Sequence, residues 1–150
     1  MNLQIASRLA IFAVLELAEN PERQLSVAEI GEKYGVSSHH LAKVMHVLGR
    51  AGLVRSVRGA GGGYQFVGNT RRTTLLDIIQ LFENFGTRDD DESPGANTSE
   101  GATLREVLGE IDDIARATLG SITIATLLSL IARQHRQPKP AEEPHELSKA

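Results

Sequence analysis

Apolar residues recur along this chain mostly at helical spacing, and they begin with an almost continuous apolar segment. Residues 3–18 are dominated by Leu, Ile, Ala, Val and Phe, interrupted only by Gln4, Ser7, Arg8 and Glu16. This pattern predicts a helix that is apolar around most of its circumference. Such a helix is usually buried on several sides, so we expect it inside the core, where it can also meet a partner subunit.

Two short helices joined by a tight turn are predicted to follow. Residues 26–29, Ser-Val-Ala-Glu, form a capping box, in which the serine accepts from a free backbone N–H and the glutamate reaches back. The helix that they start should run to residue 33 or 34, because Gly35 tolerates the left-handed turn that ends many helices. Ser37 then caps a second helix over residues 38–50. This order is typical of a helix-turn-helix.

The second helix of this motif has two chemically different faces. At about 100° per residue, four apolar side chains fall on one side, and four hydrogen-bonding or cationic side chains gather within about 60° on the other. His40 lies at the edge of the apolar side, where we expect a structural role. The apolar set is Leu41, Val44, Met45 and Leu48, and the polar set is His39, Lys43, His46 and Arg50.

A glycine-rich loop separates two short β-prone runs after this motif. The runs cover residues 53–57 and 64–67, and the loop reads Arg-Gly-Ala-Gly-Gly-Gly over residues 58–63. A nucleotide-binding glycine loop would lead into a helix, and a strand follows here. A plain flexible hairpin stays open, as does a wing whose bare backbone approaches nucleic acid. Because the loop directly follows a helix-turn-helix, we favour a winged helix, with the recognition helix in the major groove.

The predicted DNA-facing set combines the recognition helix and the wing. Arg58 at the wing tip can reach a phosphate or a narrow A·T minor groove. Gly62 is expected to need a positive φ. Tyr64 can pack beneath the wing or give its hydroxyl to a phosphate, and we favour packing. The full set is Ser37, Ser38, His39, Lys43, His46, Arg50, Arg55, Arg58, Gly59, Gly61, Gly62, Gly63 and Tyr64.

The rest of the chain is predicted to be helical on either side of a polar loop. A second capping box at residues 74–77 opens a helix that should reach about Asn84. Apolar spacing later predicts a long helix that Gly120 interrupts, and a last helix over residues 123–133. The chain is thus divided into a winged-helix region (1–84), an acidic loop (85–101), dimerisation helices (102–133) and a charged, Pro-containing tail in which we expect disorder (134–150).

Charge is distributed unevenly, although the formal net charge is only −3. No Asp or Glu occurs from Lys33 to Leu76, whereas residues 77–150 hold twice as many acids as bases. This segregation predicts a positive field around the winged helix of an acidic molecule. The chain has no cysteine, no apolar run that could span a membrane and no secretory signal, so we expect a cytoplasmic protein without disulfides.

The winged-helix segment resembles the Rrf-two family of bacterial regulators, which includes those called IscR and NsrR. The specific parts are the run HHLAKVMHVLGRAGLV and the wing RGAGGGY, and TTLLDIIQLFE matches the helix that follows. The segment LREVLGEIDDIARATLGSITIATLL is similar to the family's long dimerisation helix and terminal helix. The resemblance covers about residues 1–132 and implies a homodimer that binds a partly palindromic operator near a promoter.

The loop before the long helix departs from this family. Well-known members hold an iron–sulfur cluster there with three cysteines, whereas Ala96 and Ala102 stand at two of those positions, and Asp90 lies six residues before Ala96. An alanine methyl cannot ligate iron, so we expect no cluster and no nitric oxide response through one. A regulator whose cysteines were replaced stays open. A cation site at the acidic residues 89–92 is conceivable, but a solvated loop is favoured.

We therefore predict a DNA-binding transcriptional regulator that acts as a homodimeric repressor. The alternative is a winged helix that contacts another protein through its acidic half. An enzyme is disfavoured, because no cysteine nucleophile exists and no pattern places a His, Asp and Ser set. Double-stranded DNA is the expected partner, and a protein or small-molecule effector stays open. Subunit contacts are predicted at the apolar stripe Leu104, Leu108, Ile111 and Ile114.

Overall fold

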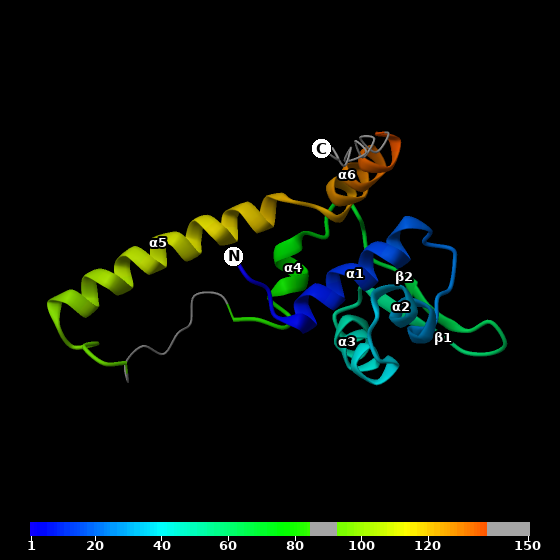
Figure 1. Ribbon diagram of the computed structural model, residues 1–150, viewed down its shortest axis with the longest axis horizontal. Helices are drawn as coiled ribbons and strands as arrows, with labels where there is room; N and C mark the ends of the chain where they lie inside the picture. Colours follow the sequence, from blue (N-terminus) through cyan, green and yellow to red (C-terminus); the bar gives the residue numbers. More distant parts are fainter. Residues whose placement is uncertain (85–92, 138–150) are drawn as a thin grey trace, which may run out of the picture.

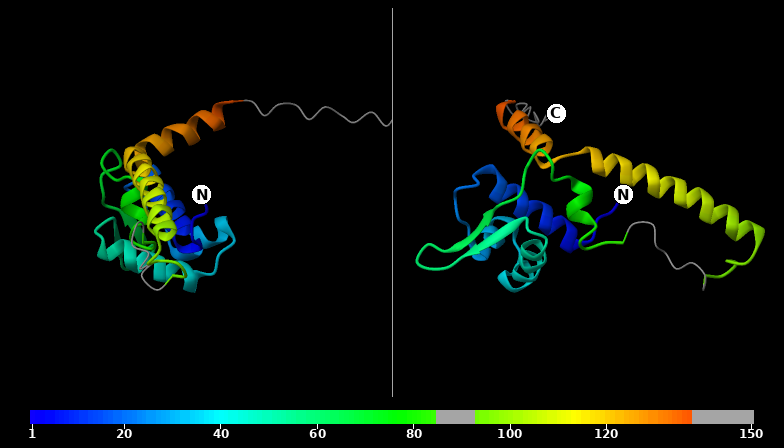
Figure 2. Two further views of the ribbon diagram at one scale, coloured as in Figure 1. Left: turned by 90° about the vertical axis from the view of Figure 1, so that its left-hand side faces the viewer. Right: turned by 180° about the vertical axis from the view of Figure 1, so that it is seen from behind.

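The computed structural model describes residues 1–84 and 93–137, and this part of the chain is mainly helical with a two-stranded antiparallel sheet, as predicted. The elements are α1 (Ile5–Glu19), α2 (Val27–Tyr34), α3 (Ser38–Arg50), β1 (Val54–Val57), β2 (Gly63–Phe66), α4 (Leu75–Ile79), α5 (Ser99–Ser121) and α6 (Ile124–Arg136). Helices α1 to α4 and the β-hairpin form a body. Helix α5 extends from this body on the side away from the hairpin tip (Figure 1, Figure 2).

Helix α1 lies at the centre of the body, as its nearly continuous apolar sequence predicts. Ala10, Ala13, Val14 and Leu17 are fully buried. The helix contacts α3, α4, α6 and β2, so these elements share one aliphatic core. Complete burial of one Val or Leu side chain contributes about 1.5–3 kcal/mol, which makes this shared core the main source of stability.

The helix-turn-helix is set by the caps that the sequence predicts. Ser26 Oγ accepts a hydrogen bond from Glu29 N at 3.1 Å, and Glu29 Oε2 accepts one from Ser26 N at 2.8 Å. Helix α2 ends at Gly35, whose φ is 66°. Ser37 Oγ accepts from His40 N at 3.3 Å and starts α3. The turn between the two helices therefore follows from local chemistry, and it fixes the direction of α3.

The base of the wing is joined to the helix-turn-helix by an isolated β-bridge between the chain before α2 and strand β2. Strands β1 and β2 pair antiparallel with Val54 opposite Phe66. Leu25, just before α2, exchanges backbone hydrogen bonds of 3.1 and 2.8 Å with Tyr64 on β2. Gly63 allows this close approach, because an added Cβ would lie 2.5 Å from Leu25 O. The base of the wing is therefore held in place relative to α2 and α3.

Helix α4 is shorter than predicted, and the expectation that it reaches Asn84 is wrong. It ends at Ile79, and the chain continues in tight turns through Glu83. These turns bring Glu83 against α1, where its carboxylate accepts a hydrogen bond from Ser7 Oγ. Ser7 is completely buried, and a buried hydroxyl requires such a partner. The turns after α4 thus place Glu83 where it satisfies this buried hydroxyl.

The two C-terminal helices are longer than predicted. Helix α5 begins inside the predicted 85–101 loop, and Gly120 does not interrupt it. It ends at Ser121, and the next residue, Ile122, is extended and accepts a hydrogen bond from Leu75 N at its carbonyl at 2.9 Å. Helix α6 includes residues 134–136, which were predicted to belong to a disordered tail. Residues 85–92 and 138–150, with the predictions made for them, lie outside the described part.

Candidate nucleic-acid interface

Helix α3 has the two faces that its sequence predicts. Its apolar side chains Leu41, Val44, Met45 and Leu48 are at most 3% exposed and hold the helix against the body. The opposite side is exposed to solvent. That side carries no carboxylate, so it offers hydrogen-bond donors, imidazole nitrogens and positive charge. Its side chains are His39, Lys43, His46 and Arg50.

The first turn of α3 carries a further exposed histidine beside the predicted set. His40 is exposed, which contradicts the structural role expected for it. A spacing of three residues places it one turn before Lys43, and this spacing was a signal available in the sequence. Ser37 and Ser38 are also exposed, and the Ser37 hydroxyl already caps the helix. Side chains at the start of a recognition helix are those that commonly meet base edges, so His40 joins the candidate set.

Arg55 is held in position on the wing by a chain of hydrogen bonds. Its Nη2 donates to Gln65 Oε1 at 2.9 Å on the opposite strand, and Gln65 Nε2 donates to the Glu22 carbonyl at 3.0 Å. Arg58 lies beyond the strands at the exposed tip. The wing thus presents one guanidinium fixed along its length and another at its end.

The glycine loop closes the wing tip by two different physical means. Gly59 and Gly61 have φ values of 113° and 74°, which side chains rarely tolerate. Gly62 has no positive φ, so the reason expected for this glycine is wrong. It is required because an added Cβ would lie 2.5 Å from Val57 O. Its N–H also closes the turn by donating to Gly59 O at 2.9 Å.

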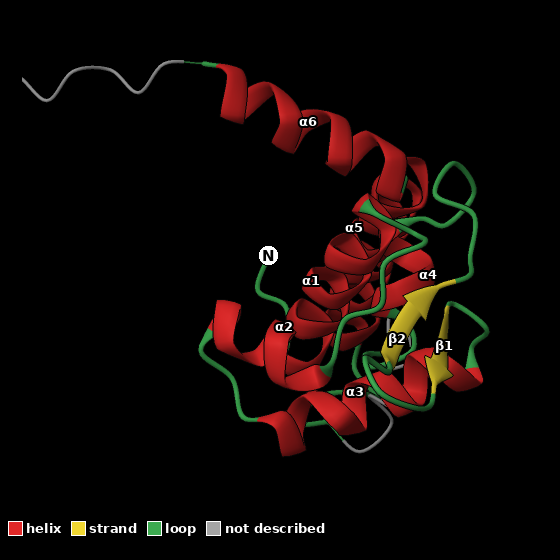
Figure 3. Ribbon diagram, turned by 90° about the vertical axis from the view of Figure 1, so that its right-hand side faces the viewer, coloured by secondary structure: helices red, strands yellow, loops and turns green. Residues whose placement is uncertain are grey.

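Strand β1 contacts α3, so the wing and α3 are neighbouring parts of the molecule (Figure 3). Tyr64, at the base of the wing, is half-buried and packs against the core. This packing favours a structural role for Tyr64 beneath the wing over a hydrogen bond from its hydroxyl to a phosphate.

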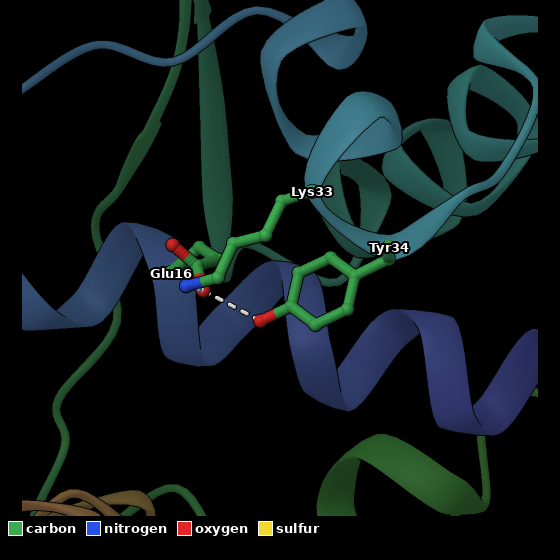
Figure 4. A network of polar contacts seen from close by, with 3 residues as sticks. All are labelled: Glu16, Lys33 and Tyr34. Carbon is green, nitrogen blue, oxygen red and sulfur yellow. Dashed lines mark hydrogen bonds and ion pairs between the residues drawn. The ribbon is translucent and has the colours of Figure 1, made fainter. Parts of the chain in front are cut away.

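Lys33 belongs to the acid-free segment but is engaged within the body. It forms an ion pair with Glu16 of α1, and its Nζ lies 5.6 Å from the ring centroid of Tyr34 (Figure 4). Tyr34 donates its hydroxyl hydrogen to the same carboxylate and stacks on Phe12 at a centroid distance of 4.7 Å. These contacts join α1 to α2, so Lys33 has a structural role that the exposed cations of α3 do not share.

The Glu16 carboxylate is stabilised in its charged form by this network. Partial burial raises the pKa of Glu16, but hydrogen bonds from Lys33 and Tyr34, with the positive charge of Lys33, outweigh burial and hold the pKa below its usual range. Burial and the hydrogen bond to Glu16 raise the pKa of the Tyr34 phenol well above its ordinary value. Tyr34 therefore serves as a hydrogen-bond donor throughout the neutral range.

The arrangement of helix, helix-turn-helix and wing matches known regulators over most of the chain. The Rrf2 family, described as iron-dependent transcriptional regulators, matches residues 3–130. The chain belongs to this family. BadM of Rhodopseudomonas palustris, named as an HTH-type transcriptional regulator, is 49% identical over 137 residues, which cover 91% of this chain and 87% of BadM.

Solved structures give the same result for the fold of this Rrf2 chain. CymR, the global cysteine regulator of B. subtilis, is similar with a TM-score of 0.71 and 29% identity, covering 87% of this chain and 98% of CymR. IscR of T. potens is similar with a TM-score of 0.67 and 28% identity, covering 93% of this chain and 94% of that one. The chain is therefore a winged-helix, DNA-binding transcriptional regulator and not an enzyme.

The cysteine ligands that usually hold an iron–sulfur cluster are missing from this Rrf2 chain, although the family description names iron. The chain has no cysteine, and the side chains of Ala96 and Ala102 end in methyl groups. Within residues 1–84 and 93–137, no three His, Asp or Glu side chains gather as a metal site. The residues present therefore do not fit an iron–sulfur cluster. Asp90 and the cation site considered at residues 89–92 lie outside the described residues.

A second surface of this Rrf2 chain is an uncovered apolar stripe along α5. Five large aliphatic side chains on one side of the helix are between 39% and 68% exposed. The stripe consists of Leu104, Val107, Leu108, Ile111 and Ile114. Contiguous exposed apolar surface of this kind marks an interaction site. No helix in the described residues is long and apolar enough to cross a membrane.

Proposed function

We propose that this Rrf2 chain is a cytoplasmic, homodimeric repressor that binds a partly palindromic operator. The observation that carries the proposal is the exposed polar face of α3, which lies beside the wing in a segment without carboxylates. Such a face suits the major groove. Its cations can also neutralise backbone phosphates, which releases counterions and favours binding.

Helix α3 and the wing have different roles in this proposal: α3 reads the bases, and the wing positions the protein on the DNA backbone. In this proposal α3 enters the major groove, and His39, His40 and Lys43 meet base edges near the start and middle of the helix. Arg50, at the end of α3, contacts phosphate. The wing follows the flanking backbone with Arg58 on a phosphate or in a narrow minor groove.

The apolar stripe of α5 supports pairing of two copies. A helix with this much uncovered aliphatic surface gains stability when a second copy covers it, and two-fold symmetry lets one surface serve both partners. Two recognition helices then meet half-sites about one helical turn apart, which explains why the operator is expected to be partly palindromic.

Repression requires no surface beyond these two. A dimer seated over a promoter blocks polymerase by occupying the DNA. A protein or small-molecule effector would act by changing the geometry of the dimer.

Footprinting on the DNA upstream of the protein's own gene tests the proposal and supplies the operator. Operator and random-duplex affinities are then measured for His39→Ala and Lys43→Ala. Each base contact is worth about 1–3 kcal/mol, so we expect the specificity ratio to fall about 5- to 150-fold. Arg133→Ala is the matched control, because Arg133 is an exposed cation on α6 rather than on α3 or the wing. Wild-type specificity ratios for both α3 variants would show that this face does not read the operator.

A further inference from the structure

The loop before α5 is tied to the first turn of that helix by its own hydrogen bonds. Thr98 Oγ1 accepts from Gly101 N at 3.0 Å as the helix cap and donates to Gly95 O at 2.6 Å. Arg105, one turn further along α5, donates from Nη2 to Ala96 O at 3.2 Å. We call residues 93–105, which contain these contacts, the α5 clasp.

Two glycines, Gly95 and Gly101, allow the loop backbone to approach the backbone of α5 closely. Gly95 has a φ of 80°. Its carbonyl oxygen lies 2.1 Å from where a Cβ on Gly101 would be, a separation that no side chain tolerates. Backbone therefore packs directly on backbone at the start of α5, and any residue larger than glycine at position 101 must open the contact.

The space between the loop and the helix is chemically wrong for a metal centre. A hollow of about 220 Å³ lies there, and its apolar walls include Pro94, Leu104 and Leu108. The ionisable side chain in this wall is the guanidinium of Arg105, which cannot ligate and repels a cation. The hollow includes Ala96, at one of the family's two cluster-ligand positions that carry alanine here.

We infer that the α5 clasp fixes the loop to the start of α5 through protein contacts alone, at a position where the family's cluster ligands are replaced by alanine, so that operator binding is independent of iron. The first half of this inference concerns folding alone. The second half rests on the proposed function, because it requires an operator. The family description "iron-dependent" then does not apply to this member.

The first experiment compares two single glycine substitutions within α5. Gly101→Ala places a methyl group against Gly95 O, whereas an added Cβ on Gly109 meets nothing within 4 Å. Replacing glycine by alanine inside a helix normally stabilises it, so Gly109→Ala should match or exceed the wild type. We expect Gly101→Ala instead to lower Tm by about 3 °C or more. Backbone amides of residues 99–106 should also exchange hydrogen faster in Gly101→Ala. If both variants are equally stable and equally protected, the clasp does not hold the helix.

The second experiment tests iron directly on the full-length protein. Protein treated with EDTA is compared with protein incubated anaerobically with ferrous iron and sulfide, and operator affinity is measured for both. We expect affinities within about twofold and no cluster absorption in the visible range. An affinity change of about tenfold or more with bound iron would overturn the inference. A protein that binds no operator under either condition would refute the proposed function instead, and the exchange data on Gly101→Ala would still decide whether the clasp exists.

Discussion

Subunit pairing through the α5 stripe is open to a single-residue test. Ile111 lies in the middle of the stripe and is 55% exposed. In the proposed dimer a second copy covers it, so Ile111→Glu would place one carboxylate from each protomer in an apolar contact. The substitution leaves the isolated chain almost undisturbed, because the side chain makes little use of the core of its own protomer.

The expected loss follows from exposure. Full burial of an Ile side chain contributes about 1.5–3 kcal/mol, so covering the exposed half contributes about 1 kcal/mol per protomer. Leaving a polar group buried without a partner adds at least about 1 kcal/mol more. Counting both protomers, the variant weakens pairing by about 4 kcal/mol or more, which is about a thousandfold in the dissociation constant.

Sedimentation equilibrium across a concentration series measures this dissociation constant, and thermal unfolding verifies that Ile111→Glu is folded. Glu110→Gln is the matched control, because Glu110 is the exposed neighbour of Ile111 on the same helix and points about 100° away. Operator affinity should fall in parallel with dimerisation. If Ile111→Glu stays a dimer with the wild-type dissociation constant, the stripe is not the subunit contact and the geometry proposed for the operator complex fails with it.

Two further predictions concern the wing and the contact between α1 and α2. If Arg58 contacts a phosphate, Arg58→Ala should reduce the slope of log affinity against log salt concentration by about 0.9 per protomer. DNA titrations at several salt concentrations measure this slope. A wild-type slope on every duplex would exclude the phosphate contact. Because the folded pKa of Glu16 is depressed, its charge contributes stability above its ordinary pKa of 4.5, and this contribution is lost as pH falls through the lower folded value. Urea unfolding from about pH 7 to about pH 3 should therefore show a stability difference between wild type and Glu16→Gln that shrinks in acid; a constant difference would mean that the Glu16 charge does not contribute.

The sequence predicted best where local chemistry decides the structure. The capping box at Ser26 and the helix end at Gly35 depend on neighbouring residues alone, so α2 and α3 have the predicted bounds. The polar face of α3 followed from helical periodicity, and burial of Leu41 and its partners confirms the division. The DNA contacts of that face stay predictions.

Prediction failed where a distant residue decides the outcome. Nothing near Asn84 in the sequence shows that the chain turns after Ile79 or that Glu83 meets Ser7, 76 residues earlier. Gly62 was assigned a positive φ because it stands in a glycine run, yet its constraint is contact with the Val57 carbonyl across the hairpin. Both features depend on contacts between residues that are brought together only by the tertiary structure.

In the proposed dimer, the junction between α5 and α6 links the pairing surface to the DNA-facing helix. Leu75 N donates to Ile122 O at 2.9 Å and Ile124 N donates to Thr73 O at 2.9 Å, so the end of α5 is fixed to the start of α4 by backbone bonds. Helix α4 packs on α1, and α1 packs on α3. In the proposed dimer, the separation of the two recognition helices is therefore set by the α5 stripe at one end of this series of contacts and by the core at the other.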